Sequence, residues 1–383
     1  MQTVPVKKLV YADHAATTPL MPEALEAMLP FLKDDFGNPS SLHGWAKSAK
    51  KAVADARSTI AKCINAEPEE IFFTSGGTEA DNWVIKGSSG GLLVSSYEHH
   101  AVLNAAASEA KRGRDVVYVR PKAGNGGGYI MPEKLSKAWE DGIGLVSVMT
   151  ANNEIGTINP VRLLAEFTHK RGALFHTDAV QAVGHIPIDV HEMGADFLSA
   201  SAHKFNGPKG VGFLYVRNGV KLDPLLYGGQ QENGLRAGTE NVASIVGMAT
   251  ALKVNCERME DSTAYLENLT LRLRDGIDRI SPDAVYLGDG AAGQLPGFTS
   301  VSFLGHPAEG LLHMLDLKGI AVSSGAACDS KNTQISHVLK AVNATNGIAK
   351  STIRITLGVE NTVADVDKIL RALNCALGLQ RRN

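Results

Sequence analysis

The chain has 383 residues, of which 44% are hydrophobic and 20% are charged, and its formal net charge is −2. A folded chain of this length exceeds the size at which one core keeps growing, so we expect about two domains. The balanced charge, with basic residues dispersed along the chain, argues against nucleic acid and anionic membranes as partners.

In chain order, the apolar periodicity predicts helices at 22–31 and 46–63, a strand at 71–74, a helix at 78–86, a strand at 91–95, a helix at 101–112, strands at 115–119 and 144–149, a helix at 161–171, strands at 173–177, 197–199 and 212–216, and a helix at 241–260. Short apolar segments that alternate with longer amphipathic ones are typical of helices crossing between parallel strands. We therefore predict an α/β fold with a mostly parallel central sheet.

After about residue 260 the alternation changes into a mixed pattern typical of a smaller α+β domain. This part is predicted to contain a helix at 262–280, strands at 284–287 and 300–303, a helix at 308–318 and a strand at 351–356. We predict a large domain at 15–255, and a small domain that combines 1–14 with 256–383.

The cysteines and the N-terminus indicate where the protein works. The four cysteines, Cys63, Cys256, Cys328 and Cys375, are far apart in the sequence, which disfavours a disulfide framework and a zinc site. No apolar run approaches the ~20 residues of a membrane span, and the N-terminus lacks the apolar core of a secretion signal. We expect a cytoplasmic protein that uses no metal.

Lys204 follows a small, apolar strand and precedes a Gly-Pro turn in Ser201-Ala-His-Lys-Phe-Asn-Gly-Pro208. An amine near apolar walls can lose its proton and attack an aldehyde. With Asp178 and Gln181 upstream, this lysine is typical of a pyridoxal phosphate (PLP) enzyme, in which a carboxylate keeps the pyridinium nitrogen protonated. A lysine in a solvated turn is the alternative.

The segment Thr74-Ser-Gly-Gly-Thr78 runs from a predicted strand into a predicted helix. Its backbone N–H groups and hydroxyls would converge at the positive end of that helix, which is how proteins hold phosphate. Because the segment lacks the Lys-Ser/Thr ending of a nucleotide-binding loop, it favours a cofactor phosphate. A glycine-bearing helix cap without a ligand is the alternative.

Polar residues follow other predicted strands as well. Glu98-His99-His100, Asn152-Asn153 and Asp178 each come just after a strand, and open α/β sheets bind ligands at this edge. Adjacent histidines usually diverge, so we expect one to reach a bound ring and the other to lie in solvent. Separate turns and caps remain the alternative, but one cofactor accounts for all these strand ends together.

Cys328 lies in Val322-Ser-Ser-Gly-Ala-Ala-Cys-Asp-Ser330, a loop of small and polar residues, where an exposed thiol can act as a nucleophile. The other three cysteines fall within helical patterns and are expected to be core residues. Arg354 is a lone cation in an apolar strand, for which a substrate carboxylate and a structural ion pair are both plausible partners.

Taken together, these segments resemble the cysteine desulfurases, a branch of the class V aminotransferases with the PLP fold type I. The likeness covers nearly the whole chain. It rests on Asp13-His-Ala-Ala-Thr-Thr-Pro19, Gly37-Asn-Pro-Ser40, Thr74-Ser-Gly-Gly-Thr-Glu79, Glu98-His99, Asn152-Asn-Glu-Ile-Gly156, Asp178-Ala-Val-Gln181, Ser201-Ala-His-Lys204, Arg236-Ala-Gly-Thr239, Ser323-Ser-Gly-Ala-Ala-Cys328 and Arg354.

The resemblance implies a role for each matching residue. Lys204 would attach the cofactor covalently, Asp178 would bond its pyridine nitrogen, and Gln181 would bond its ring hydroxyl. His99 would stack on the ring and assist proton transfer. The remaining roles are phosphate binding by Gly77, Thr78, Ser201 and His203, joined by Thr239 from the second subunit of a homodimer, and substrate binding by Asn153 and Arg354.

The implied reaction converts L-cysteine to L-alanine and leaves the sulfur on Cys328 as a persulfide. A sulfur-acceptor protein, serving iron–sulfur cluster assembly or thiolation, would then take the sulfur from the Cys328 loop of the small domain. A selenocysteine lyase or another class V lyase or aminotransferase is the alternative enzyme. A non-catalytic assembly subunit with the same fold is the alternative from another class.

The chain departs from the pattern of the family at a few positions. Asn233 stands where many relatives have arginine, and Thr356 replaces a common serine. Asp329 places a carboxylate beside the thiol of Cys328, which opposes thiolate formation. From the short C-terminus we expect delivery of sulfur to differ from that of relatives with a longer tail.

Overall fold

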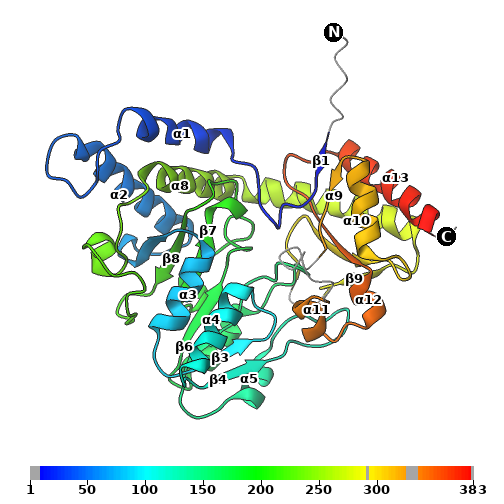
Figure 1. Cartoon of the computed structure of the whole chain (residues 1–383), viewed down its shortest axis with the longest axis horizontal. Helices are drawn as coiled ribbons and strands as arrows, with labels where there is room; N and C mark the ends of the chain where they lie inside the picture. The colour runs from blue at the N-terminus through cyan, green and yellow to red at the C-terminus, as the bar shows by residue number, and fades with distance from the viewer. Residues whose placement is uncertain (1–8, 290–292, 325–334, 381–383) are drawn as a thin grey trace, which may run out of the picture.

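The computed structural model of the chain describes residues 9–289, 293–324 and 335–380 (Figure 1). The described residues form three sheets: a large one from the first half of the chain, a small one of three strands from the last third, and a two-stranded one that includes Val10–Tyr11. The large and the small sheet lie beside each other. The described helices include none that is both long enough and apolar enough to cross a membrane.

The large sheet has seven strands in the order β2-β8-β7-β6-β5-β3-β4. Only β8 runs antiparallel to its neighbours, so the predicted α/β fold with a mostly parallel sheet is confirmed. Its strands are β2 (Ile71–Thr74), β3 (Gly91–Ser95), β4 (Val116–Val119), β5 (Ile143–Ser147), β6 (Leu174–Asp178), β7 (Phe197–Ser201) and β8 (Gly212–Val216).

Helices cover both faces of this sheet, which is why its central strands are almost entirely buried. On one face lie α3 (Gly77–Gly87) and α4 (His100–Lys111). The other face is covered by α2 (Ala46–Cys63), α5 (Pro132–Ala138), α6 (Val161–His169) and α8 (Val242–Glu257), with α1 (Pro22–Lys33) packed on α8.

The small sheet is antiparallel in the order β12-β10-β9. Its helices pack together over a separate core that includes Leu273, Leu311 and Ile353. The N-terminal β1 (Val10–Tyr11) joins this part by pairing with β11 (Ile320–Ala321). The other elements here are α9 (Met259–Ile280), β9 (Val285–Leu287), β10 (Phe298–Ser302), α10 (Ala308–Leu317), β12 (Thr352–Thr356) and α13 (Val363–Gln380).

Two helical features differ from the sequence-based expectation. The predicted helix at 241–260 ends earlier, at Glu257, and α9 begins directly after Arg258. The pattern does not predict α5 because Pro132 counts as a helix breaker, yet this proline occupies the first helical position, where no backbone hydrogen bond is lost.

Short elements complete the fold: η1 (Pro68–Glu70), α7 (Val190–Met193), η2 (Ala202–Lys204), η3 (Gln231–Gly234), α11 (His337–Ala341) and α12 (Asn346–Lys350). The domain boundary at residue 255 stays a prediction.

The turn after β5 packs against the small sheet through Gly156. This glycine has a φ of +72°, and a Cβ added to it would lie 2.6 Å from Cδ1 of Phe298 in β10. We predict that Gly156→Ala destabilises the protein by about 2–4 kcal/mol, because backbone strain and overpacking add. Urea denaturation measures the change.

Gly172→Ala is the matched control, since Gly172 has a φ of +77° but no heavy atom within 4 Å of an added Cβ. It should lose only about 1 kcal/mol, from the backbone alone. Equal shifts of the two urea midpoints would show that the contact between Gly156 and Phe298 contributes nothing.

Candidate active site

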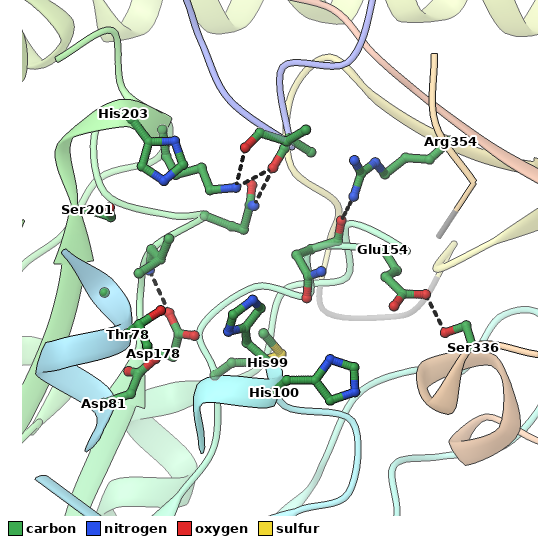
Figure 2. A pocket seen from close by; sticks show the side chains of 18 of the residues that line it. Thr78, Asp81, His99, His100, Glu154, Asp178, Ser201, His203, Ser336 and Arg354 are labelled. Atoms are coloured by element: carbon green, nitrogen blue, oxygen red, sulfur yellow. Dashed lines mark hydrogen bonds between the residues drawn. The ribbon is translucent and has the colours of Figure 1, made fainter. Parts of the chain in front are cut away.

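A cavity of about 310 Å³ lies at the carboxyl edge of the large sheet (Figure 2). Small molecules bind in cavities of roughly 300–1,000 Å³, often at this edge of an α/β sheet. The described residues named as site candidates from sequence line it with one exception: Gly77, Thr78, His99, Asn153, Asp178, Gln181, Ser201, His203, Lys204 and Arg354.

Lys204 ends the short η2 turn that follows β7. Its Nζ donates hydrogen bonds to the carbonyl oxygens of Ala15 and Ala16, at 2.6 and 2.9 Å. The carbonyl oxygen of Lys204 accepts from Nε2 of His185 at 2.8 Å, which holds the turn from behind. The amine therefore reaches the cavity wall, and the alternative of a lysine in a solvated turn does not hold.

The segment 13–16 is attached to both sheets. Gln181, which follows β6, donates from Nε2 to the carbonyl of Ala15 at 2.9 Å. From the small sheet, Oγ1 of Thr356 accepts the backbone N–H of Ala15 at 3.0 Å. The threonine that departs from the family's serine thus keeps a hydroxyl at this position, and this hydroxyl holds the backbone of the segment that Lys204 contacts.

Asp178 is buried at the end of β6, and its Oδ1 accepts the backbone N–H of Val180 at 2.9 Å. Burial raises the pKa of Asp178 to about 6, because the charged form loses water. The nearby cation of Lys204 acts in the opposite direction. A buried carboxylate of this kind is stabilised when a cation, such as a protonated ring nitrogen, binds beside it.

Two further buried carboxyl groups lie near Asp178: that of Asp81, which the sequence reasoning missed, and that of Glu98, which it placed at a strand end. Asp81 lies on α3 and lines the cavity, and burial followed by repulsion from Asp178 raises its pKa well above the usual range. Glu98 accepts from Ser95 and from the N–H of Met149, and burial raises its pKa to about 8. Asp81 lies one turn after Gly77 on the same face of α3, so the sequence could have indicated that it reaches the same site.

Two histidines of the cavity, His99 and His203, are held neutral by their surroundings. Burial, followed by the charge of Lys204, lowers the pKa of His99 and of His203 to about 4. Nδ1 of His99 accepts the N–H of Ala101 at 3.1 Å, so the proton of its neutral ring is on Nε2. His203 is fixed by the hydroxyl of Thr17 at 3.1 Å from its Nδ1.

The expectation that one of the adjacent histidines lies in solvent is wrong, because His100 lines the same cavity as His99. Helix α4 begins at His100. The ring of His100 packs against the ring of His337 from α11, with 4.4 Å between the ring centroids and a tilt of 45°. His337 contacts the carbonyl of Glu98 at 2.9 Å, and Ser336 donates to Glu154 at 2.5 Å. Sequence patterns carry no signal for these contacts, since their partners are far apart in the chain.

The N-terminus of α3 forms one end of the cavity. Gly77 must be glycine here, since a Cβ would lie 2.5 Å from Cγ2 of Val180. Gly77, Thr78, Ser201 and His203 also line an adjoining hollow, so they form a continuous wall of backbone N–H groups, hydroxyls and an imidazole. These donors and the positive helix end suit a phosphate group.

Arg354 reaches the cavity from β12 of the small sheet. It forms an ion pair with Asp13 at 2.7 Å and donates to the carbonyl oxygen of Asn153 at 2.6 Å. The ion pair expected for this arginine is therefore present, and a substrate carboxylate remains compatible with the geometry. The buried Nε of Arg354 and the buried Oδ1 of Asn153 have no hydrogen-bond partner among the described residues. A substrate carboxylate and amine are groups that could satisfy them.

The other candidates from sequence are not brought to the cavity of this single chain. Thr239 is exposed and lines no part of it, and its role across a subunit boundary stays a prediction. Cys328 and Asp329 lie outside the described residues. Asn233 has a φ of +57°, a left-handed conformation that asparagine adopts more readily than arginine.

Comparisons with known proteins agree with this site. The Aminotransferase class-V family model matches residues 10–369. A protein named cysteine desulfurase IscS from Clostridium botulinum (strain Hall) is 45% identical over 376 residues, covering 96% of this chain and 94% of that protein. A solved NifS-like protein superposes with a TM-score of 0.89 at 36% identity, covering 97% of this chain and 100% of the other.

A second solved structure, titled SspA in complex with cysteine, has a TM-score of 0.80 at 34% identity and covers 92% of this chain and 100% of its own. The fold and the lysine-bearing cavity define a PLP enzyme of fold type I. The chain belongs to the class V aminotransferase family.

The raised pKa of Asp178 leads to a prediction for the cofactor-free protein. The folded-state pKa of Asp178 is about 6, against an ordinary 3.8. The protonated carboxyl group therefore stabilises the folded protein fully below pH 4, and this contribution is lost as the pH rises through 6. In Asp178→Asn the side chain is neutral at every pH and escapes this loss. We expect the free energy of unfolding of the variant, relative to wild type, to rise by about 2–3 kcal/mol between pH 4 and pH 7.

Denaturant unfolding at the two pH values measures this difference. Asp141→Asn, which removes an exposed carboxylate, is the control for a change in net charge. If the free energy of Asp178→Asn relative to wild type is the same at both pH values, burial does not perturb this carboxyl group.

Proposed function

We propose that the chain is a cysteine desulfurase, which converts L-cysteine to L-alanine and transfers the sulfur to Cys328. The observation that carries the proposal is one cavity that brings together the amine of Lys204, the buried carboxyl of Asp178 and the N-terminus of α3. The names of the relatives, one at 45% identity over nearly the full length and one solved with cysteine, support this substrate.

The residues present fit pyridoxal phosphate. The helix end at Gly77 and Thr78, with Ser201 and His203, suits its phosphate, and Asp178 at the other end suits its pyridinium nitrogen. Gln181 and Lys204 line the same cavity, and in this proposal Gln181 would bond the ring hydroxyl and Lys204 would supply the amine for the aldehyde. When bound, PLP withdraws electrons from the substrate Cα and so weakens the bonds to that carbon.

The side chains around the cavity orient the substrate and move its protons. Arg354 binds the carboxylate of cysteine through its unpartnered Nε side, and Asn153 lies beside it. His99, neutral and protonated on Nε2, would donate or receive a proton beside the bound cofactor. Lys204 would take the proton from the substrate Cα at its Nζ.

Cys328 receives the sulfur. Its thiolate attacks the sulfur atom of the substrate, the bond from that sulfur to the substrate Cβ breaks, and the products are a persulfide on Cys328 and L-alanine. An acceptor protein for iron–sulfur cluster assembly or thiolation then takes the terminal sulfur. The protein works in the reducing cytoplasm, which keeps this thiol available.

The working form is a homodimer in which Thr239 of each subunit reaches the phosphate of the other. Support comes from large apolar side chains that a single chain leaves in solvent on α1 and on the connection from α1 to α2. These side chains are Leu25, Leu29, Leu32, Phe36, Leu42 and Trp45, of which Leu32 is 59% and Phe36 71% exposed. Apolar surface of this extent on neighbouring segments is typical of a subunit interface.

Replacing the sulfur-accepting thiol separates this function from its alternatives. We expect Cys328→Ala to lower the formation of L-alanine and sulfide from L-cysteine by at least about 100-fold, while the visible absorbance of the bound cofactor is kept. Cys375→Ala, at an exposed cysteine of α13, is the control and should act like wild type. Retained turnover of Cys328→Ala would favour a selenocysteine lyase or an aminotransferase instead.

Replacing the cofactor lysine tests whether the chain is an enzyme at all. In Lys204→Ala, borohydride treatment with PLP should leave no cofactor attached at this position, and turnover should disappear, because no other described residue that lines the cavity is a lysine. Lys221→Ala removes an exposed lysine and should keep both properties. Wild-type protein that stays colourless after addition of PLP would point to a non-catalytic subunit.

A further inference from the structure

Two cysteines that the proposed sulfur transfer does not use form a pair. Cys63 is the last residue of α2, and Cys256 lies in the last turn of α8, the helix against which α2 packs. The thiol of Cys256 lies 3.9 Å from the carbonyl oxygen of Cys63, to which it donates. Two cysteines that are distant in the sequence therefore lie beside each other in the fold.

A small molecule can reach this pair. Both cysteines are partly exposed, and both line a groove of about 680 Å³ between the end of α2 and the start of α9. The described residues that line this groove include none that line the active-site cavity. The walls of the groove are mostly apolar, with Val183, Ile186 and Leu252 among them. The thiols are thus accessible without any movement of the substrate site.

The contact also makes the two sulfurs chemically different. The pKa of Cys63 is raised, first by its hydrogen bond to Cys256 and then by burial. The pKa of Cys256 is lowered, first by its interaction with the side chain of Cys63. A thiolate held beside a second thiol is the arrangement in which an oxidised sulfur is captured as a disulfide.

We propose that Cys63 and Cys256 form a reversible disulfide on reaction with a peroxide. The thiolate of one cysteine attacks a peroxide oxygen, the O–O bond breaks, and the products after proton uptake are a sulfenic acid and water. The sulfur of the second cysteine then attacks the first, the S–S bond forms, the S–O bond breaks, and a second water leaves with the thiol proton. Two thiols are oxidised and one peroxide is reduced by two electrons.

The pair lies close to the segment that holds the cofactor lysine. Asn255, next to Cys256, donates from Nδ2 to the carbonyl oxygen of Phe205 at 2.8 Å, and Phe205 follows Lys204. The proposed bond would therefore fix the end of α8 at the point where it supports the lysine turn. It would also link two positions far apart in the chain, which restricts the unfolded state and raises the melting temperature.

The test uses the reduced, PLP-loaded full-length protein and hydrogen peroxide. After treatment, free thiols are blocked with iodoacetamide and the protein is digested without reduction for mass spectrometry. We expect one cross-linked peptide pair containing Cys63 and Cys256, lighter than its two parts by two hydrogen atoms and released by dithiothreitol. Loss of alkylation at this pair should be at least about tenfold faster than at exposed Cys375.

Three variants serve as controls, and each should remain folded by circular dichroism. Cys63→Ser and Cys256→Ser should each abolish the cross-linked peptides, whereas Cys375→Ser should keep them. The proposal is overturned if Cys63 and Cys256 stay fully alkylated at peroxide concentrations that oxidise Cys375. It is equally overturned if the cross-link forms as fast in urea-unfolded protein, because the fold would then not bring the sulfurs together. None of these results depends on desulfurase activity.

Discussion

The contact between the amine of Lys204 and the backbone carbonyls of Ala15 and Ala16 joins the two halves of this structure. The lysine belongs to the large sheet, and the carbonyls belong to a segment that enters from the strand β1 beside the small sheet. That segment is held from the other side by Thr356 and by the ion pair of Asp13 with Arg354. The position of the lysine therefore depends on residues from both ends of the chain.

The same arrangement explains the electrostatics of the cavity. Asp178, Asp81 and Glu98 are buried near one another, and burial raises the pKa of each. His99 and His203 are shifted in the opposite direction, again by burial. A site that disfavours the charged forms of these five side chains binds best a ligand that brings opposite charges to both ends, as a phosphate with a protonated ring does.

Much of this could be predicted from the sequence, because the relevant patterns are local. Alternation of apolar and amphipathic segments predicts each strand of the large sheet, and parallel strands bring their carboxyl ends to one edge, so that Asp178 and Lys204 meet. Contacts between distant segments leave no such pattern. His337, which stacks on His100, and Thr356, which holds Ala15, could be found only from the fold.

Two residues on either side of the segment 325–334 are bonded to residues of the cavity wall. Ser323 pairs through its backbone with Arg354, and Ser336 donates to Glu154. Cys328, the residue that we propose to receive the sulfur, is five residues beyond Ser323 in the sequence. The backbone partner of Ser323 is the same arginine that we propose for the substrate carboxylate. The position of the substrate and the start of the segment that carries Cys328 therefore depend on one residue of β12.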